Sequence, residues 1–106
     1  MSKASVTKGK AFERALATLM RSVWPQARRG IGQARAGGEV PDVDGTPFWL
    51  EAKRGKRISI RAAYDQAVEA SDGRVPVVVS REDRSPALVT MGLEDWLQLV
   101  GGRDAG

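Results

Sequence analysis

Residues 40–57, with the sequence VPDVDGTPFWLEAKRGKR, decide the fold predicted for this chain. Two runs of strand-forming residues are separated by Asp44-Gly45, a dipeptide typical of tight hairpin turns. In the second run, successive side chains point to opposite faces of a sheet. Glu51 and Lys53 therefore share one face and Ala52 takes the other, so we expect one face of this strand to become polar at its end.

Two carboxylates of this stretch are candidates for a metal site. Asp42 lies on the first strand of the predicted hairpin and Glu51 on the second. Carboxylates brought close together are unfavourable unless a cation neutralises them, and Mg²⁺ prefers carboxylate, carbonyl and water oxygens. Asp44 is a rival ligand because it shares a face with Asp42, although an Asp before a Gly is better explained as a turn residue.

The pattern Pro41-Asp42 followed by Glu51-x-Lys53 resembles the PD-(D/E)xK signature of a nuclease superfamily. The upstream sequence GKAFER at residues 9–14, an Arg-rich loop and a helix after the motif resemble the archaeal-type Holliday junction resolvase branch and its phage or bacterial relatives. The resemblance extends over residues 8–80. It implies an α/β fold with a restriction-endonuclease-like core, a mixed central sheet flanked by helices in the order α-β-β-β-α-β, plus an added strand and helix.

The resemblance also implies a metal-dependent reaction. Asp42 and Glu51 would bind one or two Mg²⁺ ions, helped by the backbone carbonyl of Ala52, and Mn²⁺ would substitute for Mg²⁺. The metal would activate water and neutralise charge on the scissile phosphate, while Lys53 would orient that water. The implied activity is endonucleolytic hydrolysis of DNA phosphodiester bonds, selective for branched DNA such as Holliday junctions, by a homodimer.

Two further residues enter the candidate site only through the resemblance. Glu13 corresponds to an extra acidic residue that would hold a metal-bound water from the outer shell. Gln66 would face the site from the helix that follows the motif. Taken from the residues alone, Glu13 is a surface carboxylate near a helix start, Gln66 is an exposed amide, and Glu51 with Lys53 is a strand-surface ion pair worth about 0–1 kcal/mol.

Composition limits the chemistry that this chain can perform. With 106 residues we expect a single domain, and the absence of Cys and His excludes thiolate or imidazole catalysis and leaves oxygen ligands for a metal. We expect no organic cofactor. No apolar stretch is long enough for a membrane helix or resembles a signal region, so we expect a cytoplasmic protein of a bacterial or phage-infected cell without membrane association.

The charge distribution indicates a polyanionic partner. Residues 1–61 hold 13 Lys or Arg against 5 Asp or Glu, whereas residues 62–106 hold 4 against 8. A basic half that also carries the carboxylate pair favours nucleic acid, although single charge runs are usually solvated surface. The candidate DNA-binding residues are Lys8, Lys10, Arg14, Arg28, Arg29, Arg35, Arg54, Lys56 and Arg57. Glu39 is better explained as a loop charge than as a metal ligand.

Hydrophobic periodicity predicts the remaining elements. We expect helices at 8–23, 60–70 and 93–100, an edge strand at 30–35, and further strands at 75–80 and 87–91, with loose ends at 1–7 and 101–106. Trp49 and Trp96 are predicted to be core residues. The predicted buried stripes are Phe12, Leu16, Leu19, Met20 and Val23 on the first helix, and Ala63, Tyr64, Ala67 and Val68 on the second. Apolar side chains of the last strand and helix would complete the core or form a dimer interface.

Two alternatives to a junction-selective nuclease remain open. A basic nucleic-acid-binding module without catalysis would use the arginine loop for binding and the Glu51–Lys53 pair for structure. A nuclease of the same fold would act instead on flaps, nicked duplex or single-stranded ends. Metal-dependent cleavage separates the first alternative from a nuclease, and a panel of DNA substrates separates the second.

Overall fold

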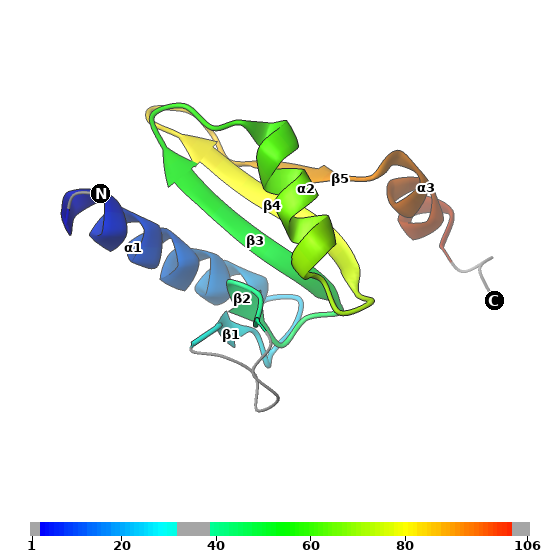
Figure 1. The fold of residues 1–106 in the computed structure, drawn as a ribbon. Helices are drawn as coiled ribbons and strands as arrows, with labels where there is room; N and C mark the ends of the chain where they lie inside the picture. Colours follow the sequence, from blue (N-terminus) through cyan, green and yellow to red (C-terminus); the bar gives the residue numbers. More distant parts are fainter. Residues whose placement is uncertain (1–2, 32–38, 103–106) are drawn as a thin grey trace.

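The computed structural model describes residues 3–31 and 39–102, with side chains from Lys8 onward. The chain folds as an α/β structure with a five-stranded mixed sheet flanked by helices (Figure 1). The element order confirms the predicted one. In chain order the elements are α1 (Lys3–Met20), β1 (Arg28–Arg29), β2 (Val43–Asp44), β3 (Phe48–Gly55), α2 (Ile60–Ala70), β4 (Val75–Glu82), β5 (Leu88–Met91) and α3 (Leu93–Gly101).

The strands follow one another across the sheet in sequence order, from β1 at one edge to β5 at the other. β1, β2 and β3 are antiparallel neighbours, with Val43 opposite Leu50, whereas β3 and β4 are parallel, with Glu51 opposite Val78. Parallel neighbours need a crossover connection, and α2 supplies it. β5 then returns antiparallel to β4.

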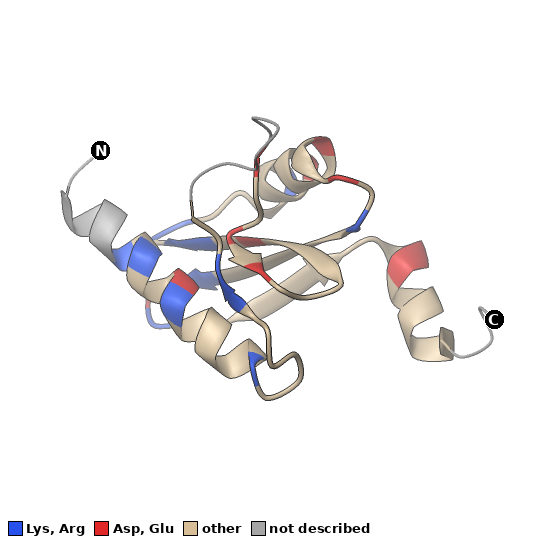
Figure 2. Cartoon of the chain, turned by 90° about the horizontal axis from the view of Figure 1, so that it is seen from below, with Lys and Arg blue, Asp and Glu red and all other residues tan. Residues whose placement is uncertain are grey.

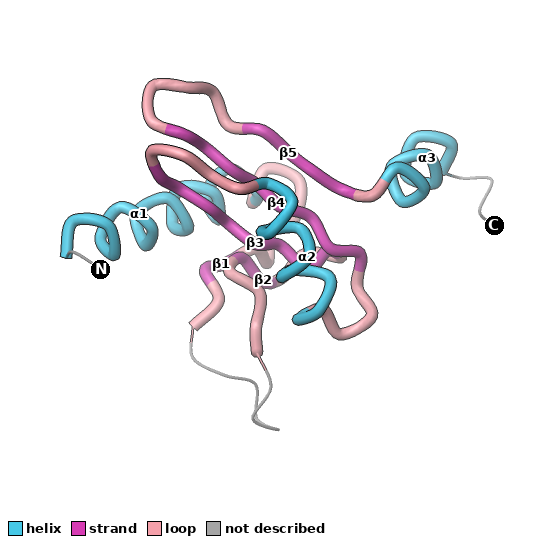
Figure 3. Tube along the Cα trace, turned by 45° about the horizontal axis from the view of Figure 1, so that its top comes forward, coloured by secondary structure: helices cyan, strands magenta, loops and turns pink. Residues whose placement is uncertain are grey.

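The two faces of the sheet are covered by different helices (Figure 3). On one face Leu16 of α1 packs into a core cluster with Val43 and Leu50. On the other face Trp49 packs with Ala63 of α2 in a second cluster. Adjacent residues of β3 thus point to opposite sides, as the alternation predicted, and the face carrying Trp49 is the one on which Glu51 and Lys53 lie.

The first helix differs from its prediction at both ends. It begins at Lys3 rather than Lys8 and ends at Met20 rather than near Val23, because the Val23 N–H donates to the Met20 carbonyl at 3.0 Å in a tighter turn. The prediction that Leu19 and Val23 are buried is wrong, since they are 69% and 64% exposed. Leu19 lies outside the core cluster and lines an open cavity with Arg81 and Ala87, and Val23 lies beyond the helix end.

The second helix confirms its predicted bounds. The Ser59 hydroxyl accepts a hydrogen bond from the Ala62 N–H at 3.3 Å and caps the N-terminus. Ala63 and Ala67 are buried as predicted. Val68 is 46% exposed, so its predicted place in the buried stripe is wrong. The buried residues of α2 are two alanines, Ala63 and Ala67, so the side of the helix that packs on the sheet is narrower than the predicted stripe.

The backbone around the hairpin is packed too closely for side chains at two glycines. Gly45 has φ +84°, and a Cβ atom there would lie 2.1 Å from the carbonyl oxygen of Gln26. A Cβ atom on Gly30 would lie 1.8 Å from the Pro41 carbonyl oxygen. The Gly30 N–H also donates to the Asp42 carbonyl at 2.8 Å, so the segment after β1 lies against the start of the hairpin.

The edge strand β1 differs from its prediction. It lies at Arg28–Arg29, before the predicted range 30–35, and it pairs with β2. Gly30 adds one hydrogen bond beyond the paired residues, from its N–H to the Asp42 carbonyl. Residues 32–35 of the predicted strand lie outside the described part of the chain.

The last helix projects beyond the sheet instead of packing on it (Figure 1). α3 follows Gly92 directly and has no buried residue. Trp96 is 48% exposed, so its predicted place in the core is wrong; the sheet ends at β5, and α3 extends beyond it. Among the described helices, none has the length and apolar character needed to cross a bilayer.

Candidate functional site

The carboxyl side chains of Asp42 and Glu51 meet at the junction of β2 and β3. The Asp42 N–H donates to the Leu50 carbonyl at 2.9 Å, and the Ala52 N–H donates to Asp42 Oδ2 at 2.8 Å. These two hydrogen bonds hold Asp42 against β3, next to Glu51. The structure therefore brings together the two carboxylates that the sequence placed on separate strands.

The electrostatics of this pair are unfavourable in the absence of a cation. Burial raises the pKa of the Asp42 carboxyl, the neighbouring Glu51 adds to the effect, and the pKa reaches about 6 although the Ala52 N–H and the charge of Lys53 act in the opposite direction. Both carboxyl groups can be ionised together only if a cation binds beside them or if their repulsion lowers the stability of the fold. A proton or a metal cation would relieve it.

Glu51 is fixed in place by a tryptophan. Its side chain is buried, with the residue 7% exposed, and the Trp49 indole Nε1–H donates to Glu51 Oε1 at 3.1 Å. The Arg74 guanidinium lies over the Trp49 ring, 5.2 Å from its centroid. Sequence reasoning identified Trp49 only as core, which is correct, and missed its hydrogen bond; the shared strand face of Trp49 and Glu51 was the available signal.

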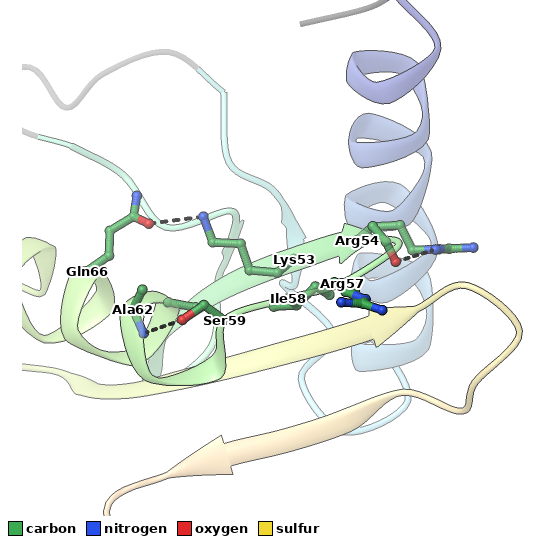
Figure 4. Close-up of a pocket in the computed structure, with 9 residues that line it drawn as sticks. Lys53, Arg54, Arg57, Ile58, Ser59, Ala62 and Gln66 are labelled. Atoms are coloured by element: carbon green, nitrogen blue, oxygen red, sulfur yellow. Dashed lines mark hydrogen bonds between the residues drawn. The ribbon is translucent and has the colours of Figure 1, made fainter.

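Lys53 continues the polar face toward α2. Its Nζ donates to Gln66 Oε1 at 3.0 Å, so the amide predicted to face the site does contact a residue of the motif (Figure 4). Lys53 and Gln66 line a cavity of about 320 Å³ together with Arg57 and Ser59, at the N-terminal end of α2. A lysine, an arginine and a helix N-terminus around one open cavity favour negatively charged groups.

The backbone carbonyl of Ala52 belongs to the same edge. In a strand, the N–H and C=O of one residue point to the same side. Because the Ala52 N–H reaches Asp42, its carbonyl is directed to the Asp42 side of β3. The oxygen donors of this edge are thus two carboxylates and one carbonyl.

Other carboxylates of the sequence are held elsewhere. Glu13 Oε1 accepts a hydrogen bond from Arg29 Nε at 2.9 Å, so the structure places Glu13 in an ion pair with an arginine of β1. Glu39 is exposed and lines a separate cavity with Glu69. In the described ranges, 3–31 and 39–102, no three acidic side chains form a cluster suited to a metal ion.

Asp44 is a turn residue, as the sequence favoured. Its Oδ1 accepts from the Gly45 N–H at 2.8 Å and from Arg74 at 3.1 Å. Burial alone would raise the pKa of Asp44, but the Gly45 hydrogen bond and the interactions with Arg74 and Arg28 outweigh it and lower the pKa. Asp44 is therefore a stable carboxylate whose charge is already balanced, unlike Asp42.

Basic residues occur along α1 and on other elements of the chain (Figure 2), and the candidate DNA-binding residues divide into two groups by their ion pairs. Four are engaged by carboxylates: Lys8 and Arg54 by Asp83, Arg28 by Asp44, and Arg29 by Glu13. Within the described residues, four others are exposed and have no ion-pair partner: Lys10, Arg14, Lys56 and Arg57. Arg35 lies outside the described residues. Lys56 and Arg57 follow β3 directly, and Arg57 lines the same cavity as Lys53.

Comparison of the chain with known proteins finds no matching family model, no matching curated protein and no matching solved structure.

Proposed function

We propose that this chain is a Mg²⁺-dependent endonuclease of the PD-(D/E)xK superfamily that hydrolyses phosphodiester bonds in DNA. The observation that carries the proposal is the pairing of two carboxyl groups, Asp42 and Glu51, in a partly buried position beside the ammonium group of Lys53: burial, with a further contribution from Glu51, raises the pKa of Asp42 to about 6. Structural ion pairs lower carboxyl pKa values. A raised value on a partly buried pair next to a lysine is typical of sites that take up a cation or a proton.

The residues fit a hard divalent cation. Mg²⁺ usually keeps several waters and takes one or two carboxylates plus substrate phosphates, and Asp42, Glu51 and the Ala52 carbonyl supply oxygen donors only. Sites for Zn²⁺ use Cys or His in most cases, and the sequence has neither residue. When bound, Mg²⁺ or Mn²⁺ would lower the pKa of a water and neutralise charge on the scissile phosphate.

The protein's own groups have distinct parts in this proposal. Ala52 and Trp49 hold the two carboxylates through the hydrogen bonds at 2.8 and 3.1 Å. Lys53, oriented by Gln66, positions a water for attack or binds the phosphate that is cut. Glu13 is held by Arg29 through Oε1, and among the described residues no hydrogen bond joins it to Asp42 or Glu51, so we place it outside the minimal set.

The substrate and the fold family belong to the same proposal. The order of elements around the motif supports a restriction-endonuclease-like core, and the resemblance to resolvases favours branched DNA cut by a homodimer. The exposed Lys56 and Arg57 next to the cavity of Lys53 support phosphate binding at this edge. Flaps, nicked duplex and single-stranded ends are the alternative substrates, and a non-catalytic binding module is the alternative function.

The decisive experiment is cleavage of four-way junction, flap, nicked, linear duplex and single-stranded DNA with and without Mg²⁺. We expect Mg²⁺-dependent cuts, highest on the junction, that are lost in Asp42→Asn and kept in Asp44→Asn, which changes a carboxylate two residues further along the chain. Binding of all substrates without any cleavage would instead support the binding module. Equal rates on junction and linear duplex would retain the nuclease and remove its junction selectivity.

A further inference from the structure

Arg74, in the short connection between α2 and β4, contacts both strands of the hairpin that brings the two carboxylates together. Its Nη1 donates to Asp44 Oδ1 at 3.1 Å, and its guanidinium carbon lies 5.2 Å from the centroid of the Trp49 ring. Asp44 belongs to β2 and Trp49 to β3. One side chain from outside the hairpin therefore joins its two strands.

The two contacts of Arg74 lie directly beside the carboxylate pair. β2 and β3 are antiparallel, with Val43 opposite Leu50. The next residues toward the turn are Asp44 and Trp49, and the next residues away from the turn are the two candidate metal ligands. Successive residues of a strand point to opposite faces, so both of these pairs lie on the face of the sheet that α2 covers. Arg74 thus holds the position next to the one at which the two ligands meet.

The orientation of the Arg74 guanidinium is fixed by two carboxylates. Asp72 accepts from Nε and Nη2, both at 2.9 Å, in the bidentate geometry that a planar guanidinium permits, and Asp44 accepts from Nη1. Two of the three bonds come from Asp72, so Asp44→Asn leaves most of this hold in place. An ammonium group is a compact charge on a flexible stem and cannot reproduce the fork, so Arg74→Lys would keep the charge and lose the geometry.

The Trp49 ring transmits this orientation to Glu51. The ring is buried, and its Nε1–H donates to Glu51 Oε1 at 3.1 Å. A cation over the face of an indole is attracted by the ring's π electrons, and it polarises them toward itself, which makes the N–H at the ring edge a stronger donor. Arg74 therefore acts on Glu51 in two ways: it keeps the ring in place, and it strengthens the hydrogen bond that holds the carboxylate.

We propose that Arg74 is a positioning residue of the candidate metal site, which holds Glu51 through Trp49 in the orientation that binds a divalent cation. The part of this inference that concerns the metal rests on the proposed function, whereas the hold on Glu51 does not. Partners that orient a metal ligand change metal affinity by about 10–100-fold when they are replaced, and Arg74 acts one contact further away, so we expect a loss of about fivefold.

The sign of the effect separates positioning from simple charge repulsion. Removal of a positive charge near a cation site lowers repulsion, so a purely electrostatic role predicts tighter Mg²⁺ binding in Arg74→Ala. Positioning predicts weaker binding in both Arg74→Ala and Arg74→Lys. Arg81→Lys is the matched control, because Arg81 lies near the other end of β4 and its guanidinium also forms a hydrogen bond, from Nε to the Ser85 carbonyl at 3.0 Å.

The first measurement needs no metal: it is the solvent exchange of the Trp49 indole N–H in the metal-free chain, followed by NMR. We expect exchange to be about fivefold faster in Arg74→Lys, because a weaker hydrogen bond to Glu51 protects the proton less, and unchanged in Arg81→Lys. Asp72→Asn alters an exposed partner of Arg74 and should give a smaller change in the same direction, so the test holds even if Arg74→Lys folds poorly. Exchange at the wild-type rate in both variants would overturn the proposal.

The second measurement is Mg²⁺ affinity, taken from the rise in melting temperature on titration of the full chain. We expect Arg74→Lys to weaken binding about fivefold and Arg81→Lys to leave it unchanged. Equal affinity in wild type and Arg74→Lys, or tighter binding in Arg74→Ala, would overturn the proposal. A wild-type protein that binds no Mg²⁺ contradicts the proposed function instead, and the indole exchange then decides alone whether Arg74 holds Glu51.

Discussion

The indole N–H of Trp49 donates to Glu51 Oε1 at 3.1 Å, two residues along the same face of β3. Trp49 is 1% exposed, so this donor is fixed by the core that surrounds the ring. One carboxylate oxygen of Glu51 therefore accepts a hydrogen bond from a rigid partner. The packing around Trp49, transmitted through this hydrogen bond, holds the Glu51 carboxylate beside Asp42. In the proposed site Trp49 is a positioning residue.

Trp49→Phe should loosen Glu51 without emptying the core of an aromatic ring. Loss of the indole donor leaves a buried carboxylate oxygen unsatisfied, which costs about 1–3 kcal/mol in the free energy of unfolding, and Mg²⁺ affinity should fall. Both are measured by denaturant unfolding and by metal titration. Trp24→Phe, which keeps an aromatic contact with Phe48 on the opposite face, is the control and should leave Mg²⁺ affinity unchanged.

Asp42→Asn should stabilise the metal-free protein at high pH. The folded pKa of Asp42 lies near 6, above its unfolded value, so ionised Asp42 lowers stability above pH 6 and this penalty fades as the pH falls through 6 toward 4. After allowance for partial solvent screening we expect a gain of about 1–2 kcal/mol at pH 8 and none near pH 4, from thermal melts across this range.

Asp44→Asn provides the matched control with the opposite sign. The pKa of Asp44 is lowered by its hydrogen bonds and by Arg74, so its charge contributes stability at neutral pH that is lost as the pH falls through the folded pKa. The substitution should destabilise the protein at pH 8. If both substitutions move the melting temperature in the same direction at pH 8, the contrast between the two carboxyls is wrong.

Mg²⁺ should stabilise the wild-type protein and restore charge balance at the site. Binding to the folded state alone raises the free energy of unfolding by about 2.7 kcal/mol at one hundred times the dissociation constant. We expect this rise in thermal melts of the wild type, its reversal by a chelator, and little rise in Asp42→Asn. Ca²⁺ should give the rise without supporting cleavage. An identical Mg²⁺ response of wild type and variant would remove Asp42 from the metal site.

Lys53→Ala should separate chemistry from DNA binding. We expect cleavage to fall by on the order of 100-fold or more, while affinity for DNA changes little because several exposed basic residues remain. Gln66→Ala, which removes only the acceptor of Lys53 Nζ, should have a smaller effect. Arg61→Ala alters an exposed basic residue of α2 that pairs with Asp65 and is the control. Cleavage by Lys53→Ala at the wild-type rate would contradict the proposed mechanism.

The salt dependence of DNA binding should identify the phosphate contacts. Lys56 and Arg57 lack ion-pair partners among the described residues, so their joint replacement by Ala should reduce the slope of log K against log salt by about 2. Arg28 and Arg29 already bind Asp44 and Glu13, and their replacement should reduce it less. An unchanged slope after replacement of the first pair would exclude this segment from the interface.

The order of the elements could be predicted from the sequence because local signals define them. Asp44-Gly45 marks the hairpin turn, the Ser59 cap marks the start of α2, and the alternation along residues 48–53 places Glu51 and Lys53 on one face. Each signal acts within a few residues, and the structure confirms each of them. The turn predicted that Asp42 and Glu51 lie on neighbouring strands, but the register that decides whether their side chains meet could not be read from the sequence, and only the resemblance implied a shared site.

Features that depend on distant parts of the chain could not be predicted. Helical spacing places Leu19 and Trp96 on the apolar faces of their helices. It does not show how much of each helix face the sheet covers, and both residues remain largely or half exposed. The partners of Glu13 and Asp44 were also hidden, because Arg29 and Arg74 come from other elements and only the register of β1 and the connection before β4 bring them close.

The close approach of Gly30 to Pro41 couples the end of β1 to the position of Asp42. The Gly30 N–H donates to the Asp42 carbonyl at 2.8 Å, and a Cβ atom at residue 30 would lie 1.8 Å from the Pro41 carbonyl oxygen. Gly30→Ala would therefore displace Pro41 and the neighbouring Asp42, so one added methyl group would disturb the carboxylate pair without altering either carboxyl group.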